Sequence, residues 1–481
     1  MSGIPVVYVR DEGAYRVALH FRVGCADETV LTSGITHAVE HLALYPLGQQ
    51  PYGYNGVVGT IRTTFFAGGT NKEVSDYLGA VCRHLMALPV DRFQMEVGIL
   101  RNEIERQGWS NQGYHYRLRY GLRGPGLSSP LNLGLLRLTT AEVQDWARAW
   151  FSAQNAALMV VGPRPLKVTL DLPHGESRRP RLPEELIHHP VWTTGAPGTV
   201  NLSIPFRRTF ESTAALGALA KRLQGRLRYD LGLSYEIGSV YEPVSADTAL
   251  AMIWATGLAK DIPRVRDELL SMLEEVGIEG PTRDELDEYR TFFDRVTEDP
   301  ASAQADADRQ IFDLLLGESP QTLASYRREL QEVTREGAAG ALRAAARRAI
   351  LTLPEDCTPA PEPWTEYPKF NYRKSPDLDV AVVSGSTFDH RLEPRLSFRR
   401  KYPQLIVGRK GVVFLEPNDH GYLYRYEDLA ALVLETDGSA SLVDERGPIY
   451  SVSSAQFRNG EIAVRELERA FPSDKIVRRA N

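Results

Sequence analysis

The sequence predicts an α+β protein with two similar domains and a small β-rich domain at its C-terminal end. In residues 1–165, strand-like segments are interspersed with amphipathic helix-like segments, a mixture that favours an α+β layer. The same order recurs in residues 199–353. Residues 400–481 change to short strands punctuated by turn residues. Two polar, Pro-rich stretches, 166–198 and 354–399, separate these parts and are predicted to be linkers.

The first domain is expected to begin with a strand and continue into a helix. Residues 15–24 alternate polar and apolar side chains, as in a half-buried strand. Thr32 or Ser33 is suited to cap a helix that runs to Leu44. We expect the remaining elements of this domain to be a strand at 60–67, helices at 72–86, 91–106 and 140–151, and a buried strand at 157–162.

The second domain repeats this order of elements. We expect a strand at 200–206, a helix at 211–228, strands at 234–241 and 249–256, and long helices between 262 and 348. No repeated residue pattern accompanies the repeated order, so the duplication is inferred from the order alone. In the C-terminal domain, residues 460–470 are amphipathic and predict one closing helix.

The composition excludes several classes of protein. A chain of 481 residues with 43% hydrophobic and 25% charged residues is typical of a folded protein with several domains. Its net charge of −6 argues against nucleic-acid binding, which usually requires a basic surface. No apolar stretch approaches the ~20 residues of a membrane span, and no signal peptide is evident, so the cytoplasm is the expected location. The three cysteines are too few and too far apart for a disulfide framework or a Cys-based zinc site.

Residues 33–44, SGITHAVEHLAL, carry the strongest functional pattern in the chain. His37 and His41 are four residues apart, so on a helix their imidazoles project from one face. Two such imidazoles can bind one zinc ion, and Glu40 beside them is a carboxylate that can take a proton from water. Chance supplies H-x-x-E-H on the order of once in a hundred chains of this kind. The alternative interpretation is a surface helix with two solvated histidines and a glutamate.

This motif and the segment EVGILRNE, residues 96–103, together resemble the pitrilysin/insulinase-type zinc metallopeptidases. The resemblance includes the two-domain bacterial processing proteases and the mitochondrial processing peptidase, and it covers about residues 5–350. It implies that each of the first two domains is a metallopeptidase-like α/β sandwich. It also implies that Glu103 is the third zinc ligand and that Glu96 is a second carboxylate that orients a histidine or transfers a proton. The residues alone do not distinguish Glu103 from Glu105 as the ligand.

Two further segments extend the resemblance to substrate-binding residues. NGVVGTIRTTFFAGG, which begins at Asn55, is similar to the family's strand beside the metal, although Gly56 replaces the usual alanine. An edge strand there could pair with the substrate backbone, and Asn55 could contact the substrate; the alternative is a core strand with a capping asparagine. LRYDLGLSYEIGS is similar to the family's Arg–Tyr motif, which implies that Arg228 and Tyr235 bind the substrate carbonyl or stabilise the oxyanion. The alternative is a surface arginine and a half-buried strand tyrosine.

The resemblance therefore implies a zinc-dependent endopeptidase that hydrolyses peptides or unfolded segments, with Zn²⁺ as its cofactor and leader-peptide processing as a candidate role. Family members assemble four such domains, so a chain with two is expected to form a homodimer or a heterodimer with a related subunit. Both motif sets are present, which favours self-sufficiency. The alternative from another class is a non-catalytic assembly or structural subunit of the same fold. Residues 400–481 faintly resemble pleckstrin-homology-like domains, and an interaction role is expected for them.

Overall fold

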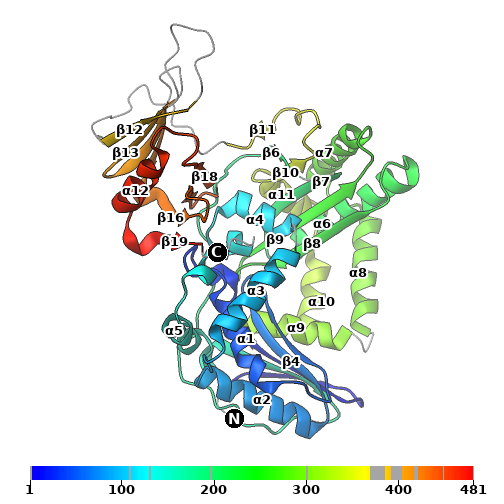
Figure 1. The fold of residues 1–481 in the computed structure, drawn as a ribbon. Coiled ribbons are helices and arrows are strands. Elements are labelled where there is room, and N and C mark those ends of the chain that lie inside the picture. Colours follow the sequence, from blue (N-terminus) through cyan, green and yellow to red (C-terminus); the bar gives the residue numbers. More distant parts are fainter. Residues whose placement is uncertain are drawn as a thin grey trace.

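The chain forms two mixed α/β layers and a C-terminal β unit, and Figure 1 shows these parts at its lower end, upper right and upper left. The computed structural model describes residues 3–107, 110–128, 132–195, 198–298, 302–368, 385–391, 404–415, 421–447 and 449–479. Among these residues, no helix combines the length and the apolar character that crossing a membrane would require.

The first sheet consists of five strands, β1 (Val6–Arg10), β2 (Tyr15–Phe21), β3 (Tyr54–Val58), β4 (Thr63–Gly69) and β5 (Ala156–Gly162). Their order is β1-β5-β2-β4-β3, with β1 parallel to β5 and all other neighbours antiparallel. The apolar run AALMVVG forms β5, which is buried along its whole length, as expected for a strand covered on both faces. Strand β3 forms one edge of this sheet.

The second sheet contains β6 (Val191–Thr194), β7 (Thr199–Arg207), β8 (Ile237–Pro243), β9 (Thr248–Thr256), β10 (Ile350–Leu353) and β11 (Thr365–Glu366). Its order is β11-β6-β10-β7-β9-β8. Apart from β11, this is the order of the first sheet, and β6 is parallel to β10 just as β1 is parallel to β5. The predicted α+β class and the predicted duplication of the architecture are confirmed.

One strand of the second sheet corrects the prediction of the first linker. Strand β6 lies within residues 166–198, which the composition assigned to a linker, and yet it is the counterpart of β1. Four residues that follow Pro190 are too few to show an alternating pattern, so the strand escaped detection. In the same way, β11 and β12 (Gly385–Asp389) lie within the second predicted linker, 354–399. The other domain limits stay a prediction.

Helices cover one face of each sheet, at the positions that the amphipathic patterns predicted. On the first sheet they are α1 (Ile35–Leu44), α2 (Asn71–Met86), α3 (Phe93–Gln107) and α5 (Thr140–Trp150), and on the second α6 (Phe210–Gln224), α7 (Ile262–Glu279) and α11 (Arg335–Ala346). Each set shares a continuous apolar core with its own sheet. Such burial is the main source of stability for both layers.

The opposite face of each sheet is covered by a helix from the other layer (Figure 1). Helix α9 (Ser302–Leu315) packs Ile311 and its apolar neighbours against β1 and β5 of the first sheet. Helix α4 (Asn111–Tyr120) packs on the second sheet, where Leu118 meets an apolar cluster and His115 lies 3.1 Å from the hydroxyl of Thr352. The two layers therefore exchange helices.

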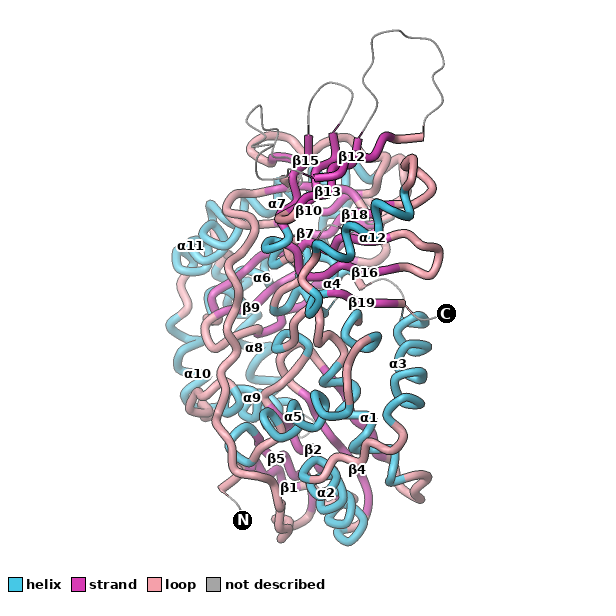
Figure 2. The backbone as a smooth tube through the Cα atoms, turned by 60° about the vertical axis from the view of Figure 1, so that its left-hand side comes forward, coloured by secondary structure: helices cyan, strands magenta, loops and turns pink. Residues whose placement is uncertain are grey.

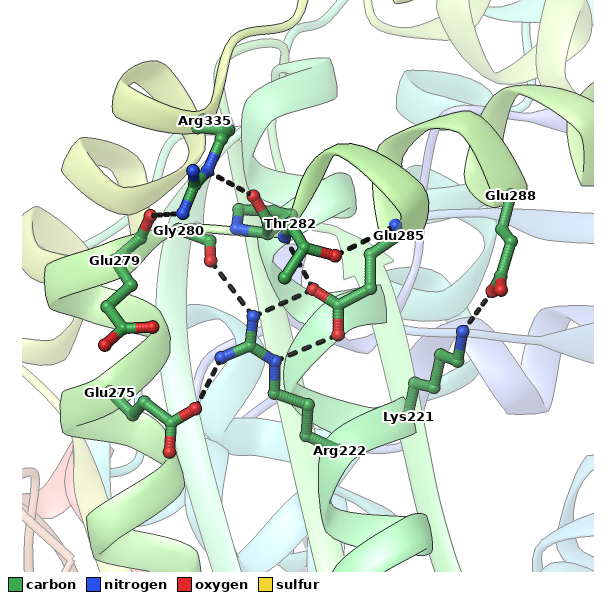
Figure 3. Close-up of polar contacts among 10 residues, drawn as sticks. Lys221, Arg222, Glu275, Glu279, Gly280, Thr282, Glu285, Glu288 and Arg335 are labelled. Carbon is green, nitrogen blue, oxygen red and sulfur yellow. Dashed lines mark hydrogen bonds and ion pairs between the residues drawn. The ribbon is translucent and has the colours of Figure 1, made fainter.

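A single arginine joins three helices of the second layer (Figure 3). The guanidinium of Arg222 on α6 donates twice to Glu285 of α8 (Arg283–Glu298), at 2.9 and 2.8 Å, and once to Glu275 of α7 at 2.8 Å. The side chains of Arg222 and Glu285 are both only 13% exposed, so water screens this pair weakly. The neighbouring pair of Lys221 and Glu288 is exposed. Helix α10 (Leu323–Glu332) completes the layer.

Among the described residues of the C-terminal unit, the strands form two four-stranded sheets, and one α-helix closes the unit. Figure 2 shows this unit near its upper end. Its elements are β12 to β15, with β13 (Gln404–Gly408), β14 (Gly411–Leu415) and β15 (Gly421–Arg425), then β16 (Leu429–Leu434), β17 (Ala440–Asp444), β18 (Ile449–Val452), α12 (Gly460–Ala470) and β19 (Ile476–Arg478). The closing helix is present at the predicted residues. The likeness to pleckstrin-homology-like domains stays a prediction.

This unit packs on loops of the first layer that surround the start of α1. The apolar cluster between them contains Val30, Leu122, Leu127 and Leu133 from the first layer and Ala430, Ala431, Val433, Val443 and Val477 from the C-terminal unit. The N–H of Leu122 also donates to the carbonyl of Glu445 at 2.6 Å. The C-terminal unit therefore supports the region from which α1 begins.

Candidate metal centre

Helix α1 begins with an unusual cap. Gly34 has a φ of 92°, a left-handed conformation that favours glycine, and glycine has no side chain with which to cap a helix. The carboxylate of Glu28 replaces it, since its oxygens accept the N–H groups of Gly34 at 2.7 Å and Thr36 at 2.9 Å. The prediction that Thr32 or Ser33 caps this helix is therefore wrong. The negative charge of Glu28 also suits the positive end of the helix dipole.

Glu28 is buried, and this burial controls its ionisation. Loss of hydration raises the pKa of the Glu28 carboxyl from 4.5 to about 7, although the hydrogen bonds from Gly34 and Thr36 act in the opposite direction. The N-terminal end of α1 is therefore capped by a carboxyl group that is buried away from water.

Three donor atoms converge above α1. Nε2 of His37 and Nε2 of His41 lie 3.9 and 3.6 Å from Oε2 of Glu103, which projects from α3. Tetrahedral zinc with bonds of about 2.0–2.1 Å separates its ligands by about 3.4 Å, and two imidazoles with a carboxylate fit zinc in kind. The carboxylate of Glu40 is about as close to the two imidazoles, and His37, Glu40 and His41 also form a group that could hold a metal ion. Glu105, which the sequence left as an alternative, lines a separate groove with Met95.

Glu40 lies between the two histidines and is nearly buried. Its Oε2 is 3.8 Å from Nε2 of His37 and 3.8 Å from Nε2 of His41, and its side chain is 5% exposed. Burial first, and then the charges of Glu103 and Glu96, raise the pKa of this carboxyl to about 8. Burial and the neighbouring His41 lower the pKa of His37 to about 4, so its imidazole is neutral at pH 7 and able to bind a metal.

Glu96 lies behind His41 and connects it to an arginine. Oε2 of Glu96 lies 3.2 Å from Nδ1 of His41, and Oε1 lies 3.3 Å from the guanidinium of Arg92. A hydrogen bond from Nδ1 to this carboxylate orients the ring and leaves Nε2 directed at the site, as second carboxylates do around metals. Arg92 was not predicted from the sequence, because it belongs to none of the motifs.

Strand β3 passes close to Glu40. A Cβ atom on Gly56 would lie only 2.0 Å from Oε1 of Glu40, so glycine gives the carboxylate the space that it occupies. Asn55 is exposed, and the alternation of side chains along a strand directs it to the face opposite Gly56. The backbone carbonyl of Asn55 accepts a hydrogen bond from the hydroxyl of Tyr77 at 3.1 Å. A substrate role for the Asn55 side chain stays a prediction.

Arg228 and Tyr235 lie in the second layer, on the π-helical turn Gly225–Asp230 and in the loop before β8. The guanidinium of Arg228 lies 5.0 Å from the ring centre of Tyr235 and 5.7 Å from that of Tyr229. The tyrosines are 84% and 71% exposed, respectively. The guanidinium of Arg228 therefore lies against the ring of Tyr235, and both residues belong to the second layer, whereas His37, His41 and Glu103 belong to the first.

Comparison with known proteins identifies the fold. No protein-family model and no curated protein matches the sequence. Among solved structures, a protease from Helicobacter pylori matches with a TM-score of 0.57 at 16% identity, over 73% of this chain and 97% of that one. The peptidase M16 inactive domain from Pseudomonas fluorescens matches with a TM-score of 0.58 at 14% identity, over 75% and 98%. This chain has the M16 peptidase fold.

Pitrilysin matches as well, with a TM-score of 0.53 at 16% identity, over 74% of this chain and 44% of that one. The pitrilysin/insulinase-like fold that the motifs predicted is therefore confirmed. At these identities the matches concern the fold alone, and one of the matched M16 structures is described as an inactive domain. The chemistry has to be argued from the residues of this chain.

Proposed function

We propose that the protein is a zinc-dependent endopeptidase that hydrolyses peptides or unfolded segments. The observation that carries the proposal is the approach of three donors, since Nε2 of His37 and Nε2 of His41 both lie within 3.9 Å of Oε2 of Glu103. Two imidazoles, one carboxylate and an open position are what a catalytic zinc requires. The M16 peptidase fold supports the same chemistry. Removal of leader peptides is a candidate role within it.

Each residue around the site has a chemical task in this proposal. When bound, Zn²⁺ supplies a Lewis acid that polarises the peptide carbonyl and makes water more acidic. Glu40 takes a proton from the attacking water and returns it to the leaving amine, from its position between the two histidines. Glu96 keeps the ring of His41 in the orientation that directs Nε2 to the metal.

Glu40→Gln tests the proposal, through zinc content measured by mass spectrometry and cleavage of a quenched-peptide library. We expect one zinc per chain in both proteins and cleavage by the wild type alone. A wild type without stoichiometric zinc would overturn the metallopeptidase assignment, and unchanged cleavage by the variant would overturn the role of Glu40. Glu103→Ala should lose zinc, whereas Glu105→Ala, in the separate groove, should keep it.

We also propose that the active form is a homodimer. Arg228 and Tyr235 are exposed on the second layer, so a second copy could supply the pair to the His37–Glu103 cluster. A donor of positive charge and a phenol would then stabilise the developing oxyanion. Self-association is favoured over pairing with a related subunit because this chain carries both sets of residues.

Mixing two inactive variants tests the shared site. Glu40→Gln lacks the base and Arg228→Ala lacks the guanidinium, so each alone should cleave poorly. In a two-fold symmetric dimer, an equal mixture after subunit exchange contains one intact site in half of the dimers, which restores about a quarter of the wild-type rate. A mixture as inactive as its two components would contradict a site shared between copies.

A non-catalytic assembly or structural role is the alternative, and one observation favours it, namely the match to an inactive M16 domain. The alternative predicts that the wild type binds no stoichiometric zinc or that Glu40→Gln leaves its properties unchanged. The measurements on Glu40→Gln therefore decide between the two functions. A cytoplasmic location stays a prediction.

A further inference from the structure

A cleft of about 230 Å³ opens directly beside His37. Its walls come from separate segments of the first layer that meet around the start of α1. The residues that matter for its chemistry are Cys25, Glu28, Val58, Ile104, Leu127 and Ser128. Because His37 forms part of its wall, the cleft is continuous with the candidate metal centre.

Apolar and uncharged polar groups share the lining of this cleft, together with one carboxyl group. Val58, Ile104 and Leu127 supply the apolar surface, Thr60, Ser128 and Asn132 supply polar side chains, and Glu28 supplies the carboxyl group. The thiol of Cys25 lies 3.3 Å from the hydroxyl of Ser128, and burial raises the pKa of that thiol to about 12, so it is neutral. The three apolar side chains favour an uncharged occupant with apolar surface, which gains free energy by leaving water.

The charges around the cleft exclude an acidic occupant. The buried carboxyl of Glu28 lies in the wall, and both of its oxygens already accept backbone N–H groups, from Gly34 and Thr36. No lysine or arginine is among the described residues that form the wall. An aspartate or glutamate side chain would therefore lie close to the carboxyl group of Glu28 and would meet no lysine or arginine of the wall, which is unfavourable.

The position of the cleft along β3 relates it to the reaction. Gly56 lies against Glu40, and Val58 lies two residues further along the same strand and in the wall of the cleft. Strands rise by about 3.3 Å per residue, so Val58 lies about 7 Å along β3 from the residue that faces Glu40. A peptide extended along the β3 edge would place a side chain there, two residues from the bond that is cut.

We propose that this cleft, between His37 and Val58, binds an uncharged apolar side chain of the substrate, two residues from the scissile bond. It thereby selects peptides with leucine- or methionine-like residues at that position over peptides with acidic ones. This inference rests on the proposed endopeptidase function and adds a preference to it.

Cleavage profiling with a quenched-peptide library tests the inference. We expect the wild type to cut peptides with leucine or methionine two residues from the scissile bond about 10-fold or more faster than those with aspartate there. Val58→Phe fills the cleft and should reduce that ratio about 10-fold. Val57→Phe is the matched control, because Val57 is 53% exposed and lies on the opposite face of the same strand. In this control, we expect the ratio of the two cleavage rates to stay at the wild-type value.

A second variant keeps the test decisive if Val58→Phe does not fold. Ser128→Leu fills the same cleft from a different segment and should reduce the same ratio. The inference is overturned if the ratio of the two cleavage rates stays at the wild-type value in the folded variant, Val58→Phe or Ser128→Leu. It is also overturned if the ratio falls by the same factor in Val57→Phe. A wild type that cuts without preference at this position would overturn it as well, although the proposed function would then stand. A wild type that binds no zinc and cuts nothing would instead overturn the function itself.

Discussion

Gly56→Ala tests most directly whether Glu40 acts from its position against β3. A Cβ atom at this position would lie 2.0 Å from Oε1 and 2.8 Å from Cγ of Glu40. Non-bonded carbon atoms prefer separations of about 3.5 Å or more, so the carboxylate must move by about 1 Å. A displacement of about 1 Å from the productive geometry can cost about 100-fold in rate, which corresponds to about 2.7 kcal/mol.

We expect Gly56→Ala to bind zinc and to unfold at nearly the wild-type urea concentration, because a glutamate side chain can change its rotamer. Its kcat on a quenched peptide should fall about 100-fold. Gly53→Ala is the matched control, since a Cβ atom there meets no described heavy atom within 4 Å and the backbone is not left-handed. If Gly56→Ala cleaves as fast as the wild type while binding zinc, Glu40 does not act from this position and the reasoning is refuted.

Three further predictions concern the supports of the site and of the fold. The pKa of the Glu28 carboxyl is raised from 4.5 to about 7, so its ionisation removes about 3 kcal/mol of stability as the pH rises through this window. In urea unfolding, Glu28→Gln should gain that amount relative to the wild type between pH 4.5 and pH 8, and parallel pH profiles would contradict this. Arg222→Ala should lower the free energy of unfolding by about 3 kcal/mol because it removes the counter-charge of a nearly buried carboxylate, which keeps its hydrogen bond from the N–H of Thr282. Lys221→Ala removes an exposed pair and should cost less than about 1 kcal/mol, so equal urea midpoints for these two variants would refute the difference. Glu96→Gln should weaken zinc binding about 10- to 100-fold in chelator competition, with Glu105→Gln as the unaffected control; equal affinities would exclude an orienting role.

The parts of the site that sequence could predict are those fixed by local geometry. His37 and His41 share a helix face because four residues span about one turn, whatever the rest of the fold does. The choice between Glu103 and Glu105 depends on the direction in which α3 crosses α1, which is a tertiary property. The family resemblance favoured Glu103, and the structure directs that residue to the histidines.

The helix cap and one strand escaped prediction for different reasons. Thr32 and Ser33 are good capping residues by propensity, but the helix begins at a left-handed glycine and takes its cap from Glu28 in the preceding loop. Strand β6 is too short to show a period of two, and only its pairing with β10 reveals it. In both cases the structure depends on a partner, Glu28 or strand β10, that lies outside the short segment on which the prediction was based.

Arg228 and Tyr235 illustrate a third limit. The family resemblance implies that they act together, and their side chains do lie side by side. In the proposed homodimer a second copy would bring this pair to the His37–Glu103 cluster, and such an assembly cannot be predicted from the motifs of one chain. A sequence motif can therefore identify cooperating residues without stating which copy of the chain supplies them.

The exchange of α4 and α9 has a consequence for how this protein is made. The first sheet has no cover on one face until α9 has left the ribosome, and the second sheet depends on α4, which was synthesised before it. Contacts of such wide sequence separation slow folding and leave apolar surface open in partly synthesised chains. Neither layer is a self-contained module that gene truncation could isolate intact. A nascent chain stalled before Ser302 should accordingly be a preferred client of chaperones.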